Sequence, residues 1–148
     1  MAEFKSVTYT AQEVVTGDAS KMFATAELIS GKVSFLQVEY VTPATTANGD
    51  TALLAYLPSG MTLVPAMCTV ETVAGSGAAT IDVGIQGVVE DSIASNLDVS
   101  AAGTQILTLN SSPYVKYSER KIIEATFSAG GLTAGRTLYF NFFLVNSN

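Results

Sequence analysis

The side chains in this sequence that could do chemistry are mostly carboxylates. Asp82, Glu90, Asp91 and Asp98 lie close together along the chain. Hard cations such as Ca²⁺ take several oxygen ligands, and glycoside hydrolysis needs a pair of acidic side chains. The four residues lack the spaced D-x-D-x-D pattern of a calcium loop, and any acidic loop offers a carboxylate pair. A bound calcium ion stays an open alternative, and a hydrolase is the least favoured function.

Other catalytic residue types are scarce. The sequence contains no histidine, which removes Ser-His-Asp and Cys-His nucleophiles, histidine-ligated zinc and the commonest general base. The lone cysteine, Cys68, cannot form an internal disulfide and shares a strand face with Val64, Ala66 and Val70, so we predict a small core residue. We assign no catalytic residue, no cofactor and no metal ligand, and predict that the protein is not an enzyme.

The composition favours a protein that works through contacts. Charged residues make up 14% of the chain and hydrophobic residues 48%, whereas an average soluble protein is about 25% charged. Some apolar surface is therefore expected to be covered by partners. A chain of 148 residues is the usual size of one domain with a single core.

The charges and apolar runs exclude two kinds of partner. The seven basic residues all lie before Val33 or after Val115, which leaves an acidic middle that we expect to face solvent. Phosphate binding needs a concentrated basic stripe, so we predict no nucleic acid partner. No apolar run reaches the roughly 20 residues of a membrane span, and the start MAEFKSVTY lacks the apolar core of a signal peptide. We therefore predict no membrane partner and synthesis in a cytoplasm.

The elements that must position these residues are mostly strands. In the central stretch we predict strands over 51–57, 61–73 and 79–85, joined by turns at Pro58-Ser59-Gly60 and at 74–78, as a meander of three neighbouring strands. The first of them is apolar on both sides, which predicts that both of its faces are covered.

Five more strands and one irregular stretch complete the predicted domain. The strands are expected over 33–41, 104–109, 114–117, 121–127 and 137–145. Between them, 86–103 reads as irregular, with one helical turn at Asp91 to Leu97. Eight antiparallel strands predict an all-β, two-sheet sandwich, jelly-roll-like in preference to immunoglobulin-like because no Cys-Trp-Cys signature occurs.

The ends of the domain are predicted separately. Residues 1–31 read as an extended N-terminal arm with a short helix between Asp18 and Gly31, and residues 32–148 as a single β-sandwich domain. Tyrosines that lie in apolar strand contexts are expected to pack in the core and not to form a sugar-binding platform. These tyrosines are Tyr56, Tyr114, Tyr117 and Tyr139.

Several short motifs follow one another along the chain. They include FKSVTYT, GDT-x-x-L-x-x-LP-x-G-M and ATIDVGI. The segments concerned are Phe4 to Thr10, Gly31 to Tyr40, Gly49 to Met61, Pro65, Ala79 to Ile85 and Asp98 to Thr104. In this order they resemble small structural proteins encoded beside the major capsid protein of tailed bacteriophages, the head decoration, or cement, proteins.

The resemblance implies a jelly-roll-type sandwich that oligomerises on the outer surface of the capsid and braces neighbouring major capsid subunits. The implied partners are the major capsid protein and further copies of the chain, with a homotrimer favoured over a homodimer. We expect the arm to contact a neighbouring subunit through its apolar side chains, unless these only close the open end of the sandwich. These residues are Phe4, Val7, Tyr9, Met22 and Phe23. The alternative function is a phage head-fibre or receptor-binding module that recognises a host surface glycan.

Overall fold

The computed structural model describes residues 2–5, 33–64, 67–74, 78–107 and 117–146. These residues form ten strands: β1 (Glu3–Lys5), β2 (Val33–Val41), β3 (Thr51–Leu57), β4 (Met61–Leu63), β5 (Thr69–Thr72), β6 (Thr80–Ile85), β7 (Val89–Asp98), β8 (Gly103–Ile106), β9 (Lys121–Ala129) and β10 (Thr137–Asn146). Among the described residues, no helix is long and apolar enough to span a membrane.

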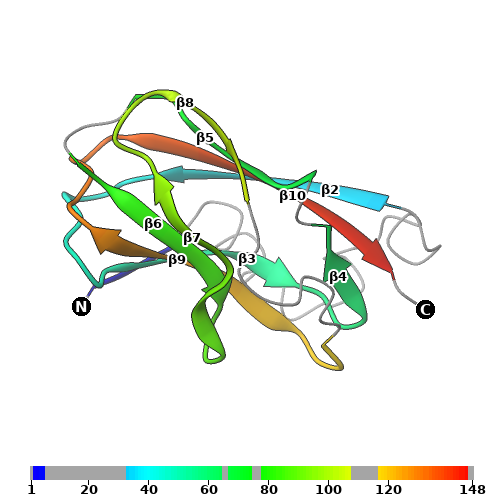
Figure 1. Ribbon diagram of the computed structural model, residues 1–148. Coiled ribbons are helices and arrows are strands. Elements are labelled where there is room, and N and C mark those ends of the chain that lie inside the picture. The colour runs from blue at the N-terminus through cyan, green and yellow to red at the C-terminus, as the bar shows by residue number, and fades with distance from the viewer. Residues whose placement is uncertain (1, 6–32, 65–66, 75–77, 108–116, 147–148) are drawn as a thin grey trace.

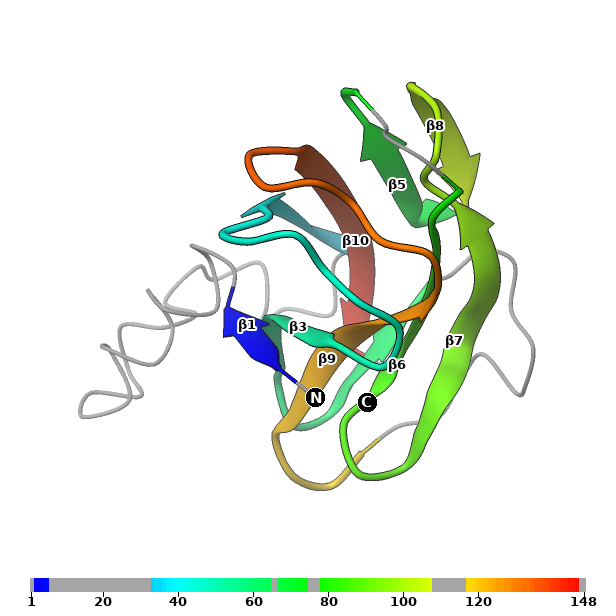
Figure 2. The same ribbon diagram turned by 90° about the vertical axis from the view of Figure 1, so that its left-hand side faces the viewer.

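The strands form two sheets that lie one above the other as the layers of a sandwich (Figures 1 and 2). Sheet A has the order β1-β3-β9-β6-β7 and sheet B the order β2-β10-β5-β8, with β4 also paired to β10. Strand β1 runs parallel to β3, and the other pairings are antiparallel. The predicted all-β, two-sheet sandwich is confirmed.

Four of the antiparallel pairs are nested along the chain. Strand β2 pairs with β10, β3 with β9, β5 with β8, and β6 with β7. Successive pairs alternate between the sheets, since the first and third belong to sheet B and the second and fourth to sheet A. The chain therefore follows the path of one long hairpin that is rolled up into two layers.

The core lies between the sheets and follows from the two-residue period of the strands. On β10, Leu138, Phe140, Phe142 and Leu144 are buried, and the rings of Phe140 and Phe142 stack with centroids 6.2 Å apart. Buried side chains of β9, such as Ile123 and Phe127, belong to the same apolar cluster. The last strand, β10, is central in sheet B, between β2 and β5.

Strand β3 is buried on both faces, as its sequence predicts, but the two faces are not those of simple alternation. A bulge shifts the register between Leu53 and Ala55, so Leu54 and Ala55 both join the main core cluster. Leu53 and Tyr56 form a second buried cluster with Ile122. Simple alternation would place Leu53, Ala55 and Leu57 on one face, but Leu53 lies on the opposite face from the other two because the extra residue reverses the alternation midway.

The predicted meander of three neighbouring strands is also wrong. Strands β3 and β6 both lie in sheet A, but β9 separates them. The strand predicted over 61–73 is two strands, β4 and β5, which both pair with β10 in sheet B. Alternation indicates which side chains are buried but not which sheet receives the strand. The turn at Pro58 to Gly60 carries the chain from one layer to the other.

The stretch over 86–103 is not irregular, because most of it is the long strand β7. Its pairing with β6 is interrupted by two register shifts, and Asn96 adopts a left-handed φ of 53°. Ile93, Ala94 and Leu97 are all buried, a spacing that imitates a helical face. The helical turn predicted at Asp91 to Leu97 is therefore wrong.

Several predictions concern residues outside the described ranges. These are the helix between Asp18 and Gly31, most of the arm, and most of the strand over 114–117. The start of the arm is described, and there Glu3–Lys5 adds to the edge of sheet A as β1, parallel to β3.

Candidate interaction site

The outward-facing side chains of sheet B form the most distinctive surface of the described chain. Because Val38 and Tyr40 of β2 and Phe140 and Phe142 of β10 point into the core, their neighbours on both strands point outward. We call this surface the outer face of sheet B. Its central residues are Phe35, Gln37, Glu39, Thr69, Glu71, Ile106, Tyr139, Asn141 and Phe143.

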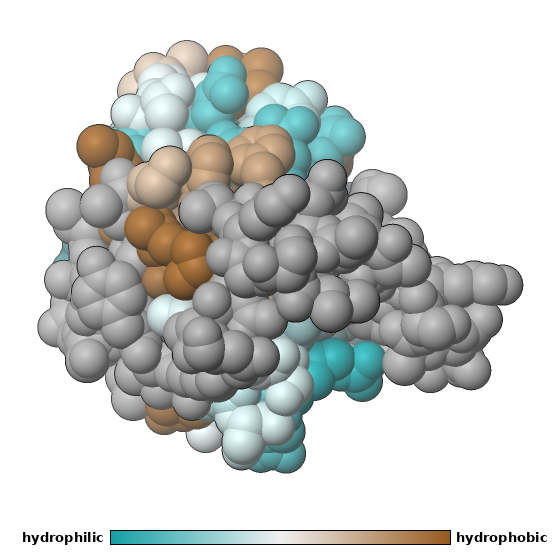
Figure 3. Space-filling view, turned by 90° about the vertical axis from the view of Figure 1, so that its right-hand side faces the viewer, coloured by the Kyte–Doolittle hydropathy of each residue, from teal (hydrophilic) through white to brown (hydrophobic). Residues whose placement is uncertain are grey.

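Two phenylalanines occupy one side of the outer face of sheet B. Phe35 and Phe143 lie directly opposite each other on β2 and β10, and their ring centroids are 5.0 Å apart with a tilt of 53°. The Phe35 side chain is 56% exposed. Figure 3 views the end of the sandwich where β2 begins and β10 ends, and hydrophobic residues are visible there among the grey segments.

More apolar side chains are exposed around this face. Ile106 on β8 is 56% exposed, Val73 just after β5 is 51% exposed, and Val41 at the end of β2 is 43% exposed. A soluble monomer rarely exposes contiguous apolar patches of more than a few hundred Å², and larger patches often mark an interface.

Polar side chains cross the middle of the face as a hydrogen-bonded row. The Gln37 amide nitrogen donates to the Asn141 side-chain oxygen at 3.1 Å. The Asn141 amide nitrogen in turn donates to the Thr69 hydroxyl oxygen at 3.1 Å. This row joins three adjacent strands and fixes the orientation of both amides.

A tyrosine between two carboxylates forms the next row. Tyr139 lies opposite Glu39 of β2 on one side and Glu71 of β5 on the other. Its hydroxyl donates to Glu39 Oε1 at 3.4 Å. The pKa of Tyr139 is raised, mainly by the negative charge of Glu39 and more weakly by Glu71. The Tyr139 side chain is half-buried and lies on the outer face of sheet B. The prediction that it packs in the core is wrong.

The other described tyrosines agree better with the sequence. Tyr56 is buried, and Arg120 lies over its ring with Cζ 4.1 Å from the centroid. Tyr117 packs against the main core cluster. Tyr114 lies outside the described residues.

The carboxylates singled out in the sequence bind the backbone of their own chain. Asp82 Oδ1 accepts a hydrogen bond from the backbone N–H of Asn96 at 2.7 Å, which supports the left-handed residue in β7. Asp98 Oδ1 accepts one from the backbone N–H of Ser100 at 2.8 Å. Hydrogen bonds from the side chain and backbone of Ser100 lower the pKa of Asp98.

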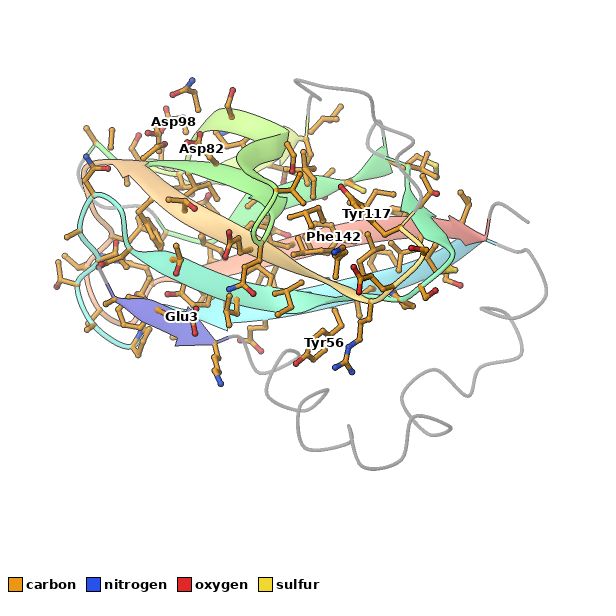
Figure 4. The ribbon with its side chains drawn as sticks, turned by 90° about the horizontal axis from the view of Figure 1, so that it is seen from below. Glu3, Tyr56, Asp82, Asp98, Tyr117 and Phe142 are labelled. Carbon is orange, nitrogen blue, oxygen red and sulfur yellow. The ribbon has the colours of Figure 1, made fainter. Side chains whose placement is uncertain are left out.

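These two carboxylates lie on β6 and β7 at one edge of sheet A, whereas Glu3 lies on β1 at the opposite edge (Figure 4). The side chains of Glu90 and Asp91 are outside the described part of the structure. In the part that is described, no three His, Cys, Asp or Glu side chains come together as a metal site.

Of the arm residues predicted to contact a neighbour, the structure describes Phe4. It is half-buried and packs against the main core cluster of its own chain, within the strand that pairs with β3. Val7, Tyr9, Met22 and Phe23 lie outside the described residues.

Cys68 is a buried core residue, as predicted. Its sulfur accepts a hydrogen bond from the backbone N–H of Phe143 at 3.3 Å and donates to the carbonyl oxygen of Val64 at 3.3 Å. Burial raises the pKa of the thiol.

Sequence reasoning missed the outer face of sheet B as a site. The available signal was Phe35, which falls on the same side of its strand as the polar residues Gln37 and Glu39. Phe35 lies on the same face as Glu71, Ile106 and Tyr139 because strands from distant segments pair. A single sequence does not reveal this pairing.

No protein-family model and no curated protein sequence matches the chain. Solved structures do resemble it. A chain of the capsid of Ralstonia phage GP4 matches with a TM-score of 0.66 and 21% identity over 80% of this chain and 86% of that chain. A chain of the cyanophage Pam1 capsid asymmetric unit matches with a TM-score of 0.56 and 17% identity over 77% of this chain and 83% of that chain.

A third match is to a chain of the acidic stable capsid structure of Helicobacter pylori bacteriophage KHP30, with a TM-score of 0.52 and 16% identity over 76% of this chain and 86% of that chain. At these identities the likeness shows a shared fold.

Proposed function

We propose that the chain is a non-enzymatic structural protein of a phage virion. The observation that carries this proposal is the likeness of its fold to chains in three phage capsids, over at least 76% of this chain in each match. The sequence adds support, because it lacks histidine and has few charges.

The more specific proposal is a decoration, or cement, protein on the outer surface of the capsid. Such a protein acts by adding interface area across the junction between neighbouring major capsid subunits, so it stabilises the assembled shell by binding it. The exposed apolar side chains around sheet B, such as Phe35 and Ile106, supply surface for such a contact. The strand order supports a jelly roll, which is a sandwich of two antiparallel sheets with Greek-key connections. Here the nested strand pairs alternate between the two sheets.

The arm is the second proposed contact. Val7, Tyr9, Met22 and Phe23 are proposed to lie on a neighbouring subunit, whereas Phe4 packs against its own core. Self-association as a homotrimer, with a homodimer as the alternative, belongs to the same proposal.

Co-sedimentation tests the proposal. The full chain, with its mass first measured by light scattering, is mixed with shells built from the major capsid protein of the same genome. Saturable sedimentation with the shells is expected, and a folded protein that stays in the supernatant would contradict a cement role. Substitution of Val7, Tyr9, Met22 and Phe23 by alanine should weaken sedimentation. The Phe4→Ala variant controls for a side chain that contacts its own core.

A glycan-binding role is the second candidate. The exposed ring of Phe35 beside the Gln37 and Asn141 amides favours it, because sugars stack on aromatic rings and bond to amides. Binding of the isolated protein to host surface glycans on an array, lost in Phe35→Ala, would support this role over the first.

A further inference from the structure

The outer face of sheet B has a charge pattern that selects its partner. Glu39 and Glu71 lie on either side of Tyr139 on adjacent strands. Because paired strands are about 4.8 Å apart, the two glutamates lie on strands roughly 10 Å apart, with the Tyr139 side chain between them and its hydroxyl at Glu39. We call the position over Tyr139, between the two carboxylates, the slot. Neither carboxylate forms an ion pair with a described Lys or Arg residue.

We propose that this slot receives an arginine or lysine side chain of a neighbouring major capsid subunit, while the Phe35 and Phe143 rings receive an apolar side chain of the same subunit. This inference rests on the proposed virion role and identifies the chemistry of the contact.

A cation suits the slot for two reasons. It would be attracted by both carboxylates at once, and the face of a tyrosine ring also attracts cations. The Tyr139 hydroxyl donates to Glu39, so Glu71 is the carboxylate with most capacity left for a donor from outside. An arginine matches this arrangement well, because its planar guanidinium stacks on a ring and donates to carboxylates at its edges.

The apolar part of the face sets the size of the partner. Phe35 is four residues from Glu39 on the same strand, which places it roughly 13 Å away along β2. A single small ligand does not cover both positions. A protein surface with one basic and one apolar side chain at this spacing does.

The same charges argue against a two-fold contact between copies of the chain that is centred on this face. Around the axis of such a contact the patch meets itself, so Glu39 and Glu71 of one copy would face those of the other. The described residues of this face include no lysine or arginine to neutralise them. The sequence predicts that the acidic residues in the middle of the chain face solvent. Under this proposal Glu39 and Glu71 instead face a partner.

The test compares two double variants with equal changes in charge. Glu39→Gln with Glu71→Gln removes both carboxylates from the slot. Asp98→Asn with Glu119→Gln removes two exposed carboxylates elsewhere on the chain. Unfolding midpoints first establish that both variants remain folded, and each is then titrated onto capsid shells at two salt concentrations.

The slot variant is expected to bind shells at least about tenfold more weakly than the wild type and with a smaller salt dependence, and the control variant within about twofold. Equal binding by the two variants would overturn this inference while leaving the virion role intact. No binding of the wild type would overturn both. A change in the solution mass of the slot variant would place the face between copies of the chain, which also contradicts the proposal.

Discussion

The carboxylate of Asp50 is bound to the backbone N–H of Ala2 by a hydrogen bond of 2.8 Å, which ties the start of the chain to the turn before β3. The second carboxylate oxygen accepts from the backbone N–H of Ala47 at 2.9 Å. The N–H of Thr51 donates to the Ala2 carbonyl oxygen at 2.8 Å. These bonds begin the parallel pairing of β1 with β3, so one buried carboxylate sets the position of the first strand.

The first prediction concerns pH. The hydrogen bonds from Ala2 and then Ala47 lower the pKa of Asp50 in the folded chain. A lowered folded pKa means that ionised Asp50 stabilises the fold above the unfolded value of about 3.9. This stabilisation is lost as the pH falls from there through the folded pKa. Asp50→Asn should therefore be less stable than the wild type at neutral pH, and the gap should narrow in acid.

Urea unfolding at neutral and acidic pH measures this gap, and amide exchange of Thr51 supplies the local readout. A Thr51 amide protected equally in Asp50→Asn and wild type would contradict the role of Asp50 in holding β1.

The second prediction contrasts two phenylalanines of sheet B. Phe142 is fully buried and Phe35 is 56% exposed. Phe142→Ala should reduce the free energy of unfolding by about 3–5 kcal/mol because it leaves a cavity. Phe35→Ala should reduce it by about 1 kcal/mol or less, mostly from the lost ring contact with Phe143. Chemical denaturation gives both values, and comparable losses would show that Phe35 is part of the core.

The third prediction concerns Gly130, which has φ of 62°. A β-carbon there would overlap the carbonyl oxygen of Ala78. Gly130→Ala should therefore destabilise the fold by at least about 3 kcal/mol, since the backbone itself must shift. Gly135 is the control, because its φ is also positive, at 78°, but a β-carbon there would meet no atom within 4 Å. Gly135→Ala should cost only about 1–2 kcal/mol. Equal thermal stabilities of the two variants would refute the packing argument.

The fourth prediction concerns the Tyr40 hydroxyl. This group is buried and has no hydrogen-bond partner among the described residues, and its pKa is strongly raised by burial and by the charge of Asp50. Tyr40→Phe removes a polar group whose desolvation is not compensated, so stability should stay equal or rise by up to about 1 kcal/mol. A marked loss of stability in Tyr40→Phe would mean that the hydroxyl has a partner.

The fifth prediction concerns the reactivity of Cys68. Burial and a raised pKa both disfavour the thiolate, which is the reactive form. A thiol reagent at mildly alkaline pH should label the folded protein only as fast as the protein opens, and labelling should be complete in denaturant. Fast labelling of the native protein would contradict this prediction, because it would mean that the reagent reaches the Cys68 sulfur in the folded protein.

The sequence predicted those features of the fold that depend on local patterns. The apolar character of both sides of β3 was enough to predict its position and the burial of both faces, and the strands predicted over 33–41 and 137–145 correspond to β2 and β10. A two-residue period carries no information on which sheet a strand joins, so the meander was wrong. The period also fails where an extra residue enters a strand, as at Leu54 in β3 and before Leu97 in β7.

The candidate site was less predictable than the fold. Asp82 and Asp98 stood out because they are close in sequence, yet each carboxylate binds a backbone N–H of its own chain. Glu39, Glu71 and Tyr139 come from three distant segments, and pairing of their strands brings them together. A site of this kind can therefore be identified only once the order of the strands in the sheet is known.

The nested strand pairs also set the order in which the protein can fold. Strands β6 and β7 are close in sequence and can meet early, whereas the outermost pair joins Val33 to Val145. Each outer pair must close a longer loop, and the loss of chain entropy on closure is smaller once the inner pairs already hold the ends together. Folding should therefore proceed from the middle of the chain outward, slowly, as is usual for topologies of high contact order. A chain emerging from the ribosome cannot complete sheet B until its last strand is released.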